Sequence, residues 1–176
     1  MAMSLYELCV PTYTQTVSAV GGFMDRTVEH CLSTGIDPDS LVEARLIEDM
    51  APFHFQVECV AHHSYWSMLA MRDGVFAPRK LRGAVPFAEL RQMIAEAERD
   101  LKALRPEEVN GWSGRKLDLQ IGPRRLAFTS ETFFLSFSLP NFHFHAVTAY
   151  DILRQRGVPI GKADYEGILR VSPASA

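Results

Sequence analysis

Cysteine is scarce in this sequence, and its three cysteines are widely spaced. Cys9, Cys31 and Cys59 are an odd number, and no CxxC motif occurs. This pattern excludes the disulfide framework of a small secreted domain and the usual structural zinc site. Each cysteine lies in an apolar stretch with helical periodicity, where a free thiol behaves as a small buried hydrophobic side chain.

Excess positive charge and long apolar runs are also missing. The 18 Lys and Arg are outnumbered by 21 Asp and Glu, which gives a net charge of −3. No basic surface for nucleic acid or anionic lipid is therefore indicated. No apolar run has the length of a membrane span, and no signal-peptide pattern is visible at the N-terminus. We expect a cytoplasmic protein that binds neither nucleic acid nor membranes.

The motifs of several enzyme classes are absent as well. The sequence has no GxSxG nucleophile elbow, no HExxH zinc motif, no Walker loop and no GxGxxG dinucleotide fingerprint. These templates therefore assign no reaction, and whether the protein is an enzyme stays open.

Long segments of helical periodicity are what the sequence does contain. A chain of this length suits one hydrophobic core, so residues 1–176 are expected to form a single domain, with a frayed SPASA tail. A capping box of Ser4 and Glu7 begins a first helix that ends at Gly35. Pro11 either kinks this helix or marks its true start.

Two further helices follow the first. One begins near Asp49 or Pro52 and the other at Pro86, and residues 71–85 between them read as a loop rich in Gly, Pro and charge. The earlier of these two helices is expected to turn one apolar stripe inward: Phe53, Val57, Val60, Ala61, Ser64 and Met68.

The periodicity then changes from helix to strand and back. Residues 116–128 alternate in polarity around Gly122-Pro123, which predicts a short β-hairpin. Thr129 or Ser130 caps a fourth helix, which Pro140 interrupts. These elements predict an all-α fold: a four-helix bundle with a short β-hairpin insertion before the last long helix.

The fourth helix carries two histidines in the stretch PNFHFHAVTAY. Residues two apart on a helix point about 200° away from each other, so His143 and His145 cannot share a metal ion there. Asn141 and His145 lie on one face at i and i+4, and that face continues into the core. We expect His145 to point inward and His143 to the side. A buried imidazole satisfied by hydrogen bonds, with no further role, explains His145 equally well.

The second helix holds three more histidines. His54 and His62 are about 12 Å apart along a helix, too far to bind one ion. His62 and His63 diverge by about 100°, so only one of them is expected to face the core. Gln56 lies on the inner stripe and needs hydrogen-bond partners there. Glu58 and His62 are i and i+4 beside the stripe, which favours a solvated pair.

Three stretches of the sequence resemble a known family. They are SLYEL with its following proline, ARLIEDMAPFHFQV, and LPNFHFHAVTAYDILRQRGVPIGKADYEG. Together they are similar to the bacterial domain of unknown function 1993 family, within the DinB/YfiT-like superfamily of proposed metalloenzymes. The resemblance spans nearly the whole chain, and the last stretch is its most specific part. It implies a DinB-like four-helix bundle that is often dimeric.

The resemblance also implies where a metal would bind. Better-characterised DinB-like relatives bind a divalent metal through one histidine on the second helix and a His-xxx-His or Glu-xxx-His pair on the fourth. Alignment on LRQRG places Asn141 and His145 on that pair. The second-helix ligand falls near Gln56, with His54 the nearest imidazole in sequence. Some relatives transfer or isomerise substrates with bacterial thiols.

Asn and Gln are poor replacements for the imidazole or carboxylate ligands of zinc or nickel. The leading hypothesis is therefore a polar pocket between helices that binds a small molecule and retains a degenerate metal site. We expect its residues to be Gln56, Asn141 and His145, joined by hydrogen bonds.

Two alternatives remain open. One is a metal-dependent transferase or hydrolase, in which a divalent ion such as Zn or Ni is held by His145 with His54, His62 or His63. The other is a non-catalytic dimerisation module, whose homodimer interface is the phenylalanine-rich surface of residues 133–144.

Overall fold

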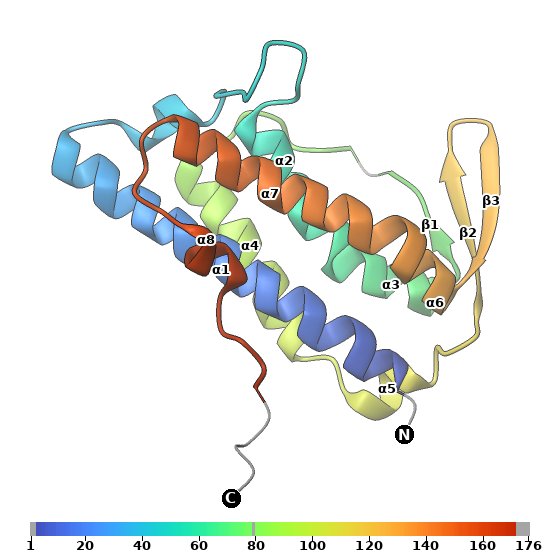
Figure 1. The fold of residues 1–176 in the computed structure, drawn as a ribbon. Coiled ribbons are helices and arrows are strands. Elements are labelled where there is room, and N and C mark those ends of the chain that lie inside the picture. The colour runs from blue at the N-terminus through green and yellow to red at the C-terminus, as the bar shows by residue number, and fades with distance from the viewer. Residues whose placement is uncertain (1–2, 79, 172–176) are drawn as a thin grey trace, which may run out of the picture.

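Helices dominate the structure, a computed structural model that describes residues 3–78 and 80–171 (Figure 1). The predicted frayed tail, residues 172–176, lies outside the described residues. The α-helices are α1 (Leu5–Thr34), α2 (Phe53–His63), α3 (Tyr65–Asp73), α4 (Phe87–Lys102), α5 (Pro106–Asn110), α6 (Ser130–Phe133), α7 (Leu139–Gln155) and α8 (Lys162–Glu166). The remaining elements are the 3₁₀ helix η1 (Pro38–Leu41), the π-helical turn η2 (Phe134–Ser138) and the strands β1 (Val75–Phe76), β2 (Lys116–Ile121) and β3 (Arg124–Thr129).

The first helix begins and ends where the sequence predicts. The N–H of Glu7 donates to Oγ of Ser4 at 3.3 Å, and the N–H of Ser4 donates to the Glu7 carboxylate at 2.8 Å. Gly35 closes the helix in the left-handed region, with φ of 70°. Pro11 lies inside α1 and is not its start. The capping box therefore fixes the beginning of the helix.

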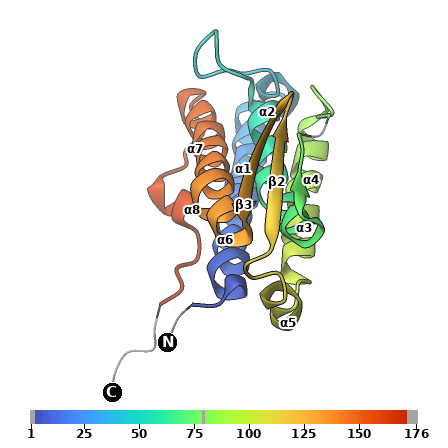
Figure 2. The ribbon, with the colours of Figure 1, turned by 90° about the vertical axis from the view of Figure 1, so that its right-hand side faces the viewer.

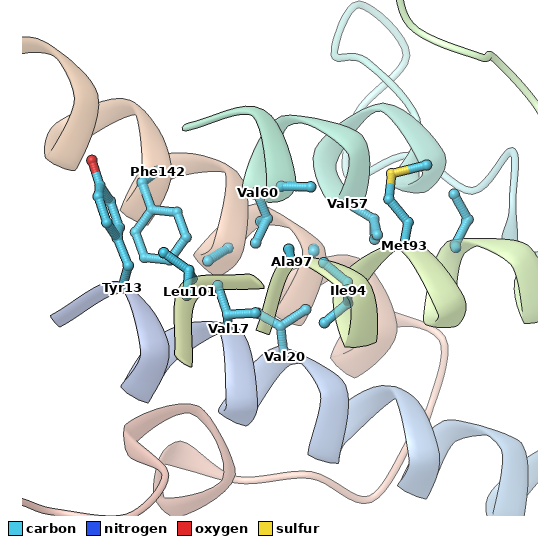
Figure 3. Packing of buried hydrophobic residues seen from close by; sticks show 14 of the residues in the cluster. Tyr13, Val17, Val20, Val57, Val60, Met93, Ile94, Ala97, Leu101 and Phe142 are labelled. Carbon is cyan, nitrogen blue, oxygen red and sulfur yellow. The ribbon is translucent and has the colours of Figure 1, made fainter. Parts of the chain in front are cut away.

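The long helices lie side by side and share one apolar core (Figures 1 and 2). Helix α2 packs on α7 and α4, and α1 packs on α4 and α7. Figure 3 shows side chains from α1, α2, α4 and α7 meeting between the ribbons, among them Val17, Val60, Ile94 and Phe142. The prediction of a mainly helical chain is confirmed. In the described part of the chain, no helix has both the length and the apolar character that a membrane crossing needs.

The predicted hairpin forms, and a third strand extends it. Strands β2 and β3 are antiparallel, and Gly122 has φ of 57° at the first position of the two-residue turn. Strand β1 pairs in parallel with β2, so the expectation that residues 71–85 are only a loop is wrong. This strand covers the edge of β2 that would otherwise be unpaired and buries Phe76 to 4% exposure.

The second helix is interrupted, contrary to the continuous stripe expected across Ser64. Ser64 has φ of −106° and ψ of −93°, outside the helical region, and separates α2 from α3. Its hydroxyl donates back to the carbonyls of Val60 and Ala61 at 2.7 and 3.2 Å. Such back-bonding competes with the helical backbone and bends helices.

The fourth helical stretch runs from α6 through η2 into α7. Thr129 caps it, since its hydroxyl accepts the N–H of Thr132 at 3.3 Å. In η2 the N–H of Leu139 bonds to the carbonyl of Phe134, five residues back. Pro140 follows directly and has no N–H with which to continue the α-helical pattern. The predicted interruption at Pro140 is therefore a π-helical turn within a continuing helix.

Candidate functional site

The two helix irregularities meet through one buried hydroxyl. Ser138, at the end of η2, donates to the carbonyl of His63 at 2.8 Å and lies 2.7 Å from Oγ of Ser67. The hydroxyl of Tyr13 on α1 lies 2.6 Å from the same Ser138 oxygen. Ser67, Ser138 and Tyr13 are fully buried. Because π-helical turns occur frequently at functional sites, the adjoining surface of α2 and α7 is a candidate functional site.

A cavity of about 460 Å³ adjoins this junction, and we call it the histidine cavity. It is walled by α2, η2 and α7, by β1 and the end of β2, and by the loop that leads from β1 to α4. Its lining residues are Phe55, Cys59, His62, His63, Phe76, Pro78, Leu81, Ile121, Phe137, Asn141 and His145.

His145 is fixed on the wall of this cavity by Gln56. Nδ1 of His145 lies 2.8 Å from Oε1 of Gln56, and Nε2 of Gln56 donates to the carbonyl of Ala51 at 2.9 Å. Gln56 is 1% exposed. The His145 ring stacks on that of His63, with centroids 5.6 Å apart and planes 13° from parallel. The prediction that His145 points inward and meets Gln56 agrees with this geometry.

Both stacked imidazoles are held in the neutral form. Burial lowers the pKa of His145 to about 4. Burial, together with repulsion from His62 and His145, lowers the pKa of His63 to about 3. Neutral imidazole has one N–H donor and one lone pair, so at neutral pH each ring offers a single donor and a single acceptor.

The hydrogen bonds of Gln56 determine which nitrogen of His145 carries the hydrogen. Since the amide nitrogen of Gln56 donates to Ala51, its oxygen faces the ring and accepts. Nδ1 of His145 must then be the donor, and Nε2 keeps the lone pair. His145 therefore presents Nε2 as a hydrogen-bond acceptor.

Asn141 shares the cavity with His145 but makes a different hydrogen bond. Its amide nitrogen donates to the carbonyl of Phe137 at 2.7 Å, within the π-helical region. Of the three expected residues, Gln56 and His145 are therefore joined by a hydrogen bond. Asn141 lies on the same face of α7 as His145 and is bonded elsewhere. Gln56 itself lies behind the ring and does not line the cavity.

The expectation that only one of His62 and His63 faces the core is wrong. Both are buried, at 6% and 7% exposure, and both line the cavity. Their ring centroids are 5.2 Å apart, and the ring of Phe76 packs against each at 4.7 and 5.7 Å. The unpredicted strand β1 supplies Phe76, and this ring covers the side of α2 that would otherwise be open.

His54 and Glu58 lie away from the cavity lining and form a separate anchor. His54 contacts the carboxylates of Glu43 and Glu58, each at 3.5 Å. Glu58 is 3% exposed and accepts the N–H groups of Arg82 and Gly83 at 2.5 and 3.1 Å. The expected solvated Glu58–His62 pair is therefore wrong. Glu58 instead binds the loop that brings Pro78 and Leu81 to the cavity. The i,i+4 spacing of His54 and Glu58 is the sequence signal for their mutual contact.

The donor set does not fit the metal site that the resemblance implies. In residues 3–78 and 80–171, no group of three or more His, Cys, Asp or Glu side chains is placed to hold a metal ion. His54 is outside the cavity, and Nδ1 of His145 is bonded to Gln56. Burial and the nearby Glu58 charge raise the pKa of Cys59 to about 12, and only the thiolate is a good ligand.

His143 lies outside the cavity, as its position on the helix predicts. Its Nδ1 is 3.0 Å from the hydroxyl of Tyr165 on α8, and burial lowers its pKa. This contact ties the short C-terminal helix to α7. His143 is therefore a structural contact on the opposite side from His145.

Comparison with known proteins supports the fold and identifies the family. No curated protein matches the chain. A crystal structure of a DinB family member protein from Shewanella denitrificans is similar in fold, with a TM-score of 0.79 at 23% identity. The match covers 96% of this chain and 95% of that one. The model of the family described as "Domain of unknown function (DUF1993)" matches residues 5–166, so the chain belongs to this family.

Proposed function

We propose that this DUF1993 protein is a DinB-like four-helix bundle that binds a small molecule in the histidine cavity. The observation that carries the proposal is the hydrogen bond that His145 donates to Gln56, which fixes the imidazole on the wall of a cavity of about 460 Å³. Ligand pockets are commonly about 300–1,000 Å³, mostly apolar, with a few oriented polar groups. The packing of α2 on α7 and of α1 on α4 supports the bundle arrangement.

A second feature favours a binding site over a core whose buried polar groups are all hydrogen-bonded to one another. Nδ1 of His63 is buried and has no hydrogen-bond partner among the described residues. Leaving such a group unsatisfied costs about 1–3 kcal/mol, so natural cores mostly avoid it. Imidazoles with strongly lowered pKa values beside a cavity are also typical of functional sites.

A fragment screen tests the proposal directly. In a two-dimensional NMR experiment, small uncharged fragments should shift the methyl signals of Leu81 and Ile121, which line the cavity. Leu81→Trp places a large ring in the cavity and should abolish the shift of the remaining methyl probe, Ile121. Ala84→Trp adds the same ring at an exposed position of the same loop and should leave the shifts of both methyl probes unchanged. A broad fragment set that shifts neither methyl group would refute the proposal.

We further propose that the metal site of DinB-like relatives is degenerate in this chain. Gln56 and Asn141 stand where the resemblance implies ligands, and both amides are already bonded to backbone carbonyls. Elemental analysis of protein purified without a metal-affinity tag should find no stoichiometric metal. Zinc or nickel should not raise the melting temperature. Bound metal at one equivalent would favour the metal-dependent transferase or hydrolase instead.

The homodimer stays a proposal with a simple test. Phe133, Phe134 and Phe142 are buried within the chain, whereas Leu135 and Phe144 are 52% and 55% exposed. An interface on this segment would therefore use only its outward side chains. Light scattering at micromolar concentration separates the outcomes, since a monomer rules out a dimerisation module.

A further inference from the structure

The histidine cavity has a neutral lining. The described residues that line it include no Lys, Arg, Asp or Glu. The lining consists of aromatic rings, aliphatic side chains, three imidazoles, one thiol and one amide. A charged ligand would lose its hydration on entry and find no opposite charge to replace it. The ligand expected here is therefore uncharged.

The walls of the cavity are largely aromatic. His63 stacks on His145 and lies nearly parallel to Phe76, at 28° and 5.7 Å, and it also contacts Phe137 at 5.7 Å. Phe55 meets the edge of the His145 ring at 5.9 Å. Aromatic rings pack well on such surfaces in stacked or edge-on arrangements, and each pair adds about 0.5–1.5 kcal/mol beyond burial of area. A flat ring is the ligand shape that these walls match.

The polar group of the ligand is determined by the His145 tautomer. Nδ1 of His145 is committed to Gln56, which leaves Nε2 with a lone pair and no hydrogen. A ligand that donates an O–H or N–H satisfies this nitrogen, whereas one that carries only acceptors does not. Sites with a buried polar group discriminate strongly against analogues that leave it unpaired.

We propose that the histidine cavity binds an uncharged planar aromatic molecule whose O–H or N–H group donates to Nε2 of His145. This inference rests on the proposed function and narrows it to one chemical class. The ligand is recognised by three features together: a flat apolar ring, a single donor and the absence of charge.

Four probes that share a methyl-substituted benzene ring separate these features. They are 4-methylphenol, which has a donor; toluene, which has none; 4-methylanisole, whose oxygen only accepts; and 4-methylbenzoate, which is an anion at pH 7. Dissociation constants are measured by NMR titration of the full-length protein at pH 7, together with the side-chain nitrogen shifts of His145. We expect 4-methylphenol to bind about tenfold more tightly than toluene or 4-methylanisole, equivalent to about 1.4 kcal/mol. It should also move the His145 Nε2 signal, and 4-methylbenzoate should not bind.

Variants add a second readout. His145→Phe keeps an aromatic ring in the stack but removes the acceptor, so 4-methylphenol and toluene should bind it equally. His143→Phe replaces the histidine that contacts Tyr165 outside the cavity and should retain the wild-type preference. If His145→Phe fails to fold, the comparison of probes on the wild-type protein still decides the question.

The possible failures are distinct. Equal affinity for 4-methylphenol and toluene, or tighter binding of 4-methylbenzoate, would overturn the ligand class while leaving a working binding cavity. If neither these probes nor any other fragment shifts a cavity signal, the proposed function fails together with the inference.

Discussion

His145 of α7 donates a hydrogen bond from Nδ1 to Oε1 of Gln56 on α2, across 2.8 Å. The bond joins two helices that are 89 residues apart in sequence at this point. It holds the ring against His63, and the tautomer that it selects leaves Nε2 as an acceptor. One buried amide thereby determines both the position and the chemistry of the imidazole.

Removing either partner should lower stability, and the two effects should be coupled. Gln56→Ala leaves the Nδ1–H of His145 without an acceptor, and His145→Ala leaves the Gln56 oxygen without a donor. Each should reduce the free energy of unfolding by about 1–3 kcal/mol, the usual cost of an unsatisfied buried group. Urea unfolding at pH 7 of both single variants and the double variant gives the coupling energy, expected to be at least about 0.5 kcal/mol.

His143 provides the matched control for this cycle. It lies on the same helix and is also half-buried, but it contacts Tyr165 and not Gln56. The effects of Gln56→Ala and His143→Ala should therefore add. If the stability losses of Gln56→Ala and His145→Ala also simply add, their hydrogen bond does not contribute the expected coupling energy.

Ser138 should be more important to stability than its size suggests. Its hydroxyl contacts Tyr13, Ser67 and the carbonyl of His63, so Ser138→Ala leaves several buried polar groups without this partner. We expect a loss of about 2–4 kcal/mol in the free energy of unfolding, from more than one unsatisfied group at about 1–3 kcal/mol each. Chemical denaturation measures it.

A nearby serine provides the control that distinguishes loss of the buried hydrogen bonds of Ser138 from the general effect of replacing serine by alanine. Ser136 lies two residues earlier in η2, is exposed, and donates only to the carbonyl of Thr132. Ser136→Ala should change stability by less than about 0.5 kcal/mol, as is usual at the surface. Equal losses from the two substitutions would mean that the buried network contributes nothing of its own.

The sequence predicts the long helices because their signals are local. The capping box at Ser4 and the left-handed Gly35 need no tertiary contact, and both stand as predicted. The Gly122-Pro123 turn is equally local. The inward positions of Gln56 and His145 follow from helical spacing alone, so the contact between these two side chains could be predicted from the sequence.

The remaining features depend on contacts that spacing does not encode. Strand β1 exists because β2 offers an unpaired edge, and nothing in its short sequence specifies that partner. At the break, the Ser64 hydroxyl bonds back to Val60, and a serine within a helical pattern does not by itself predict such a break. These two features bring His62 and His63 to the cavity, so the wall they form could not be predicted.

The neutral histidines predict a loss of stability in mild acid. The pKa of His63 is about 3 and that of His145 about 4 in the folded protein, against about 6.5 in an unfolded chain. Below about pH 6.5 the unfolded state therefore binds more protons than the folded state, and the free energy of unfolding falls as the pH decreases. Above that pH the two groups add no dependence.

Urea unfolding between pH 7 and pH 5 measures this slope, and His63→Gln should reduce it. NMR titration of the ring signals gives the same answer independently, because neither His63 nor His145 should take up a proton above pH 5. Rings that titrate near pH 6.5 would show that both are open to water and would contradict their burial.

Glu58 should control access to the histidine cavity through the loop it binds. Its carboxylate accepts the N–H groups of Arg82 and Gly83, and the Arg82–Gly83 peptide bond is a trypsin site. Proteolysis requires this segment to leave Glu58, so the cleavage rate reports how often the loop opens. Glu58→Gln replaces a charged acceptor by a neutral one. If it weakens the closed loop by about 1.4 kcal/mol, cleavage after Arg82 should become about tenfold faster.

Glu43 offers the matched control, because its carboxylate also contacts His54 but is 60% exposed, and its other ion pair is with Arg45, outside the loop. Glu43→Gln should leave the cleavage rate unchanged, and circular dichroism should show both variants folded. Mass spectrometry of the early fragments identifies the cleaved bond. An equal rate in Glu58→Gln and wild type would mean that the loop is held by Pro78 and Leu81 packing over the cavity and not by the buried carboxylate.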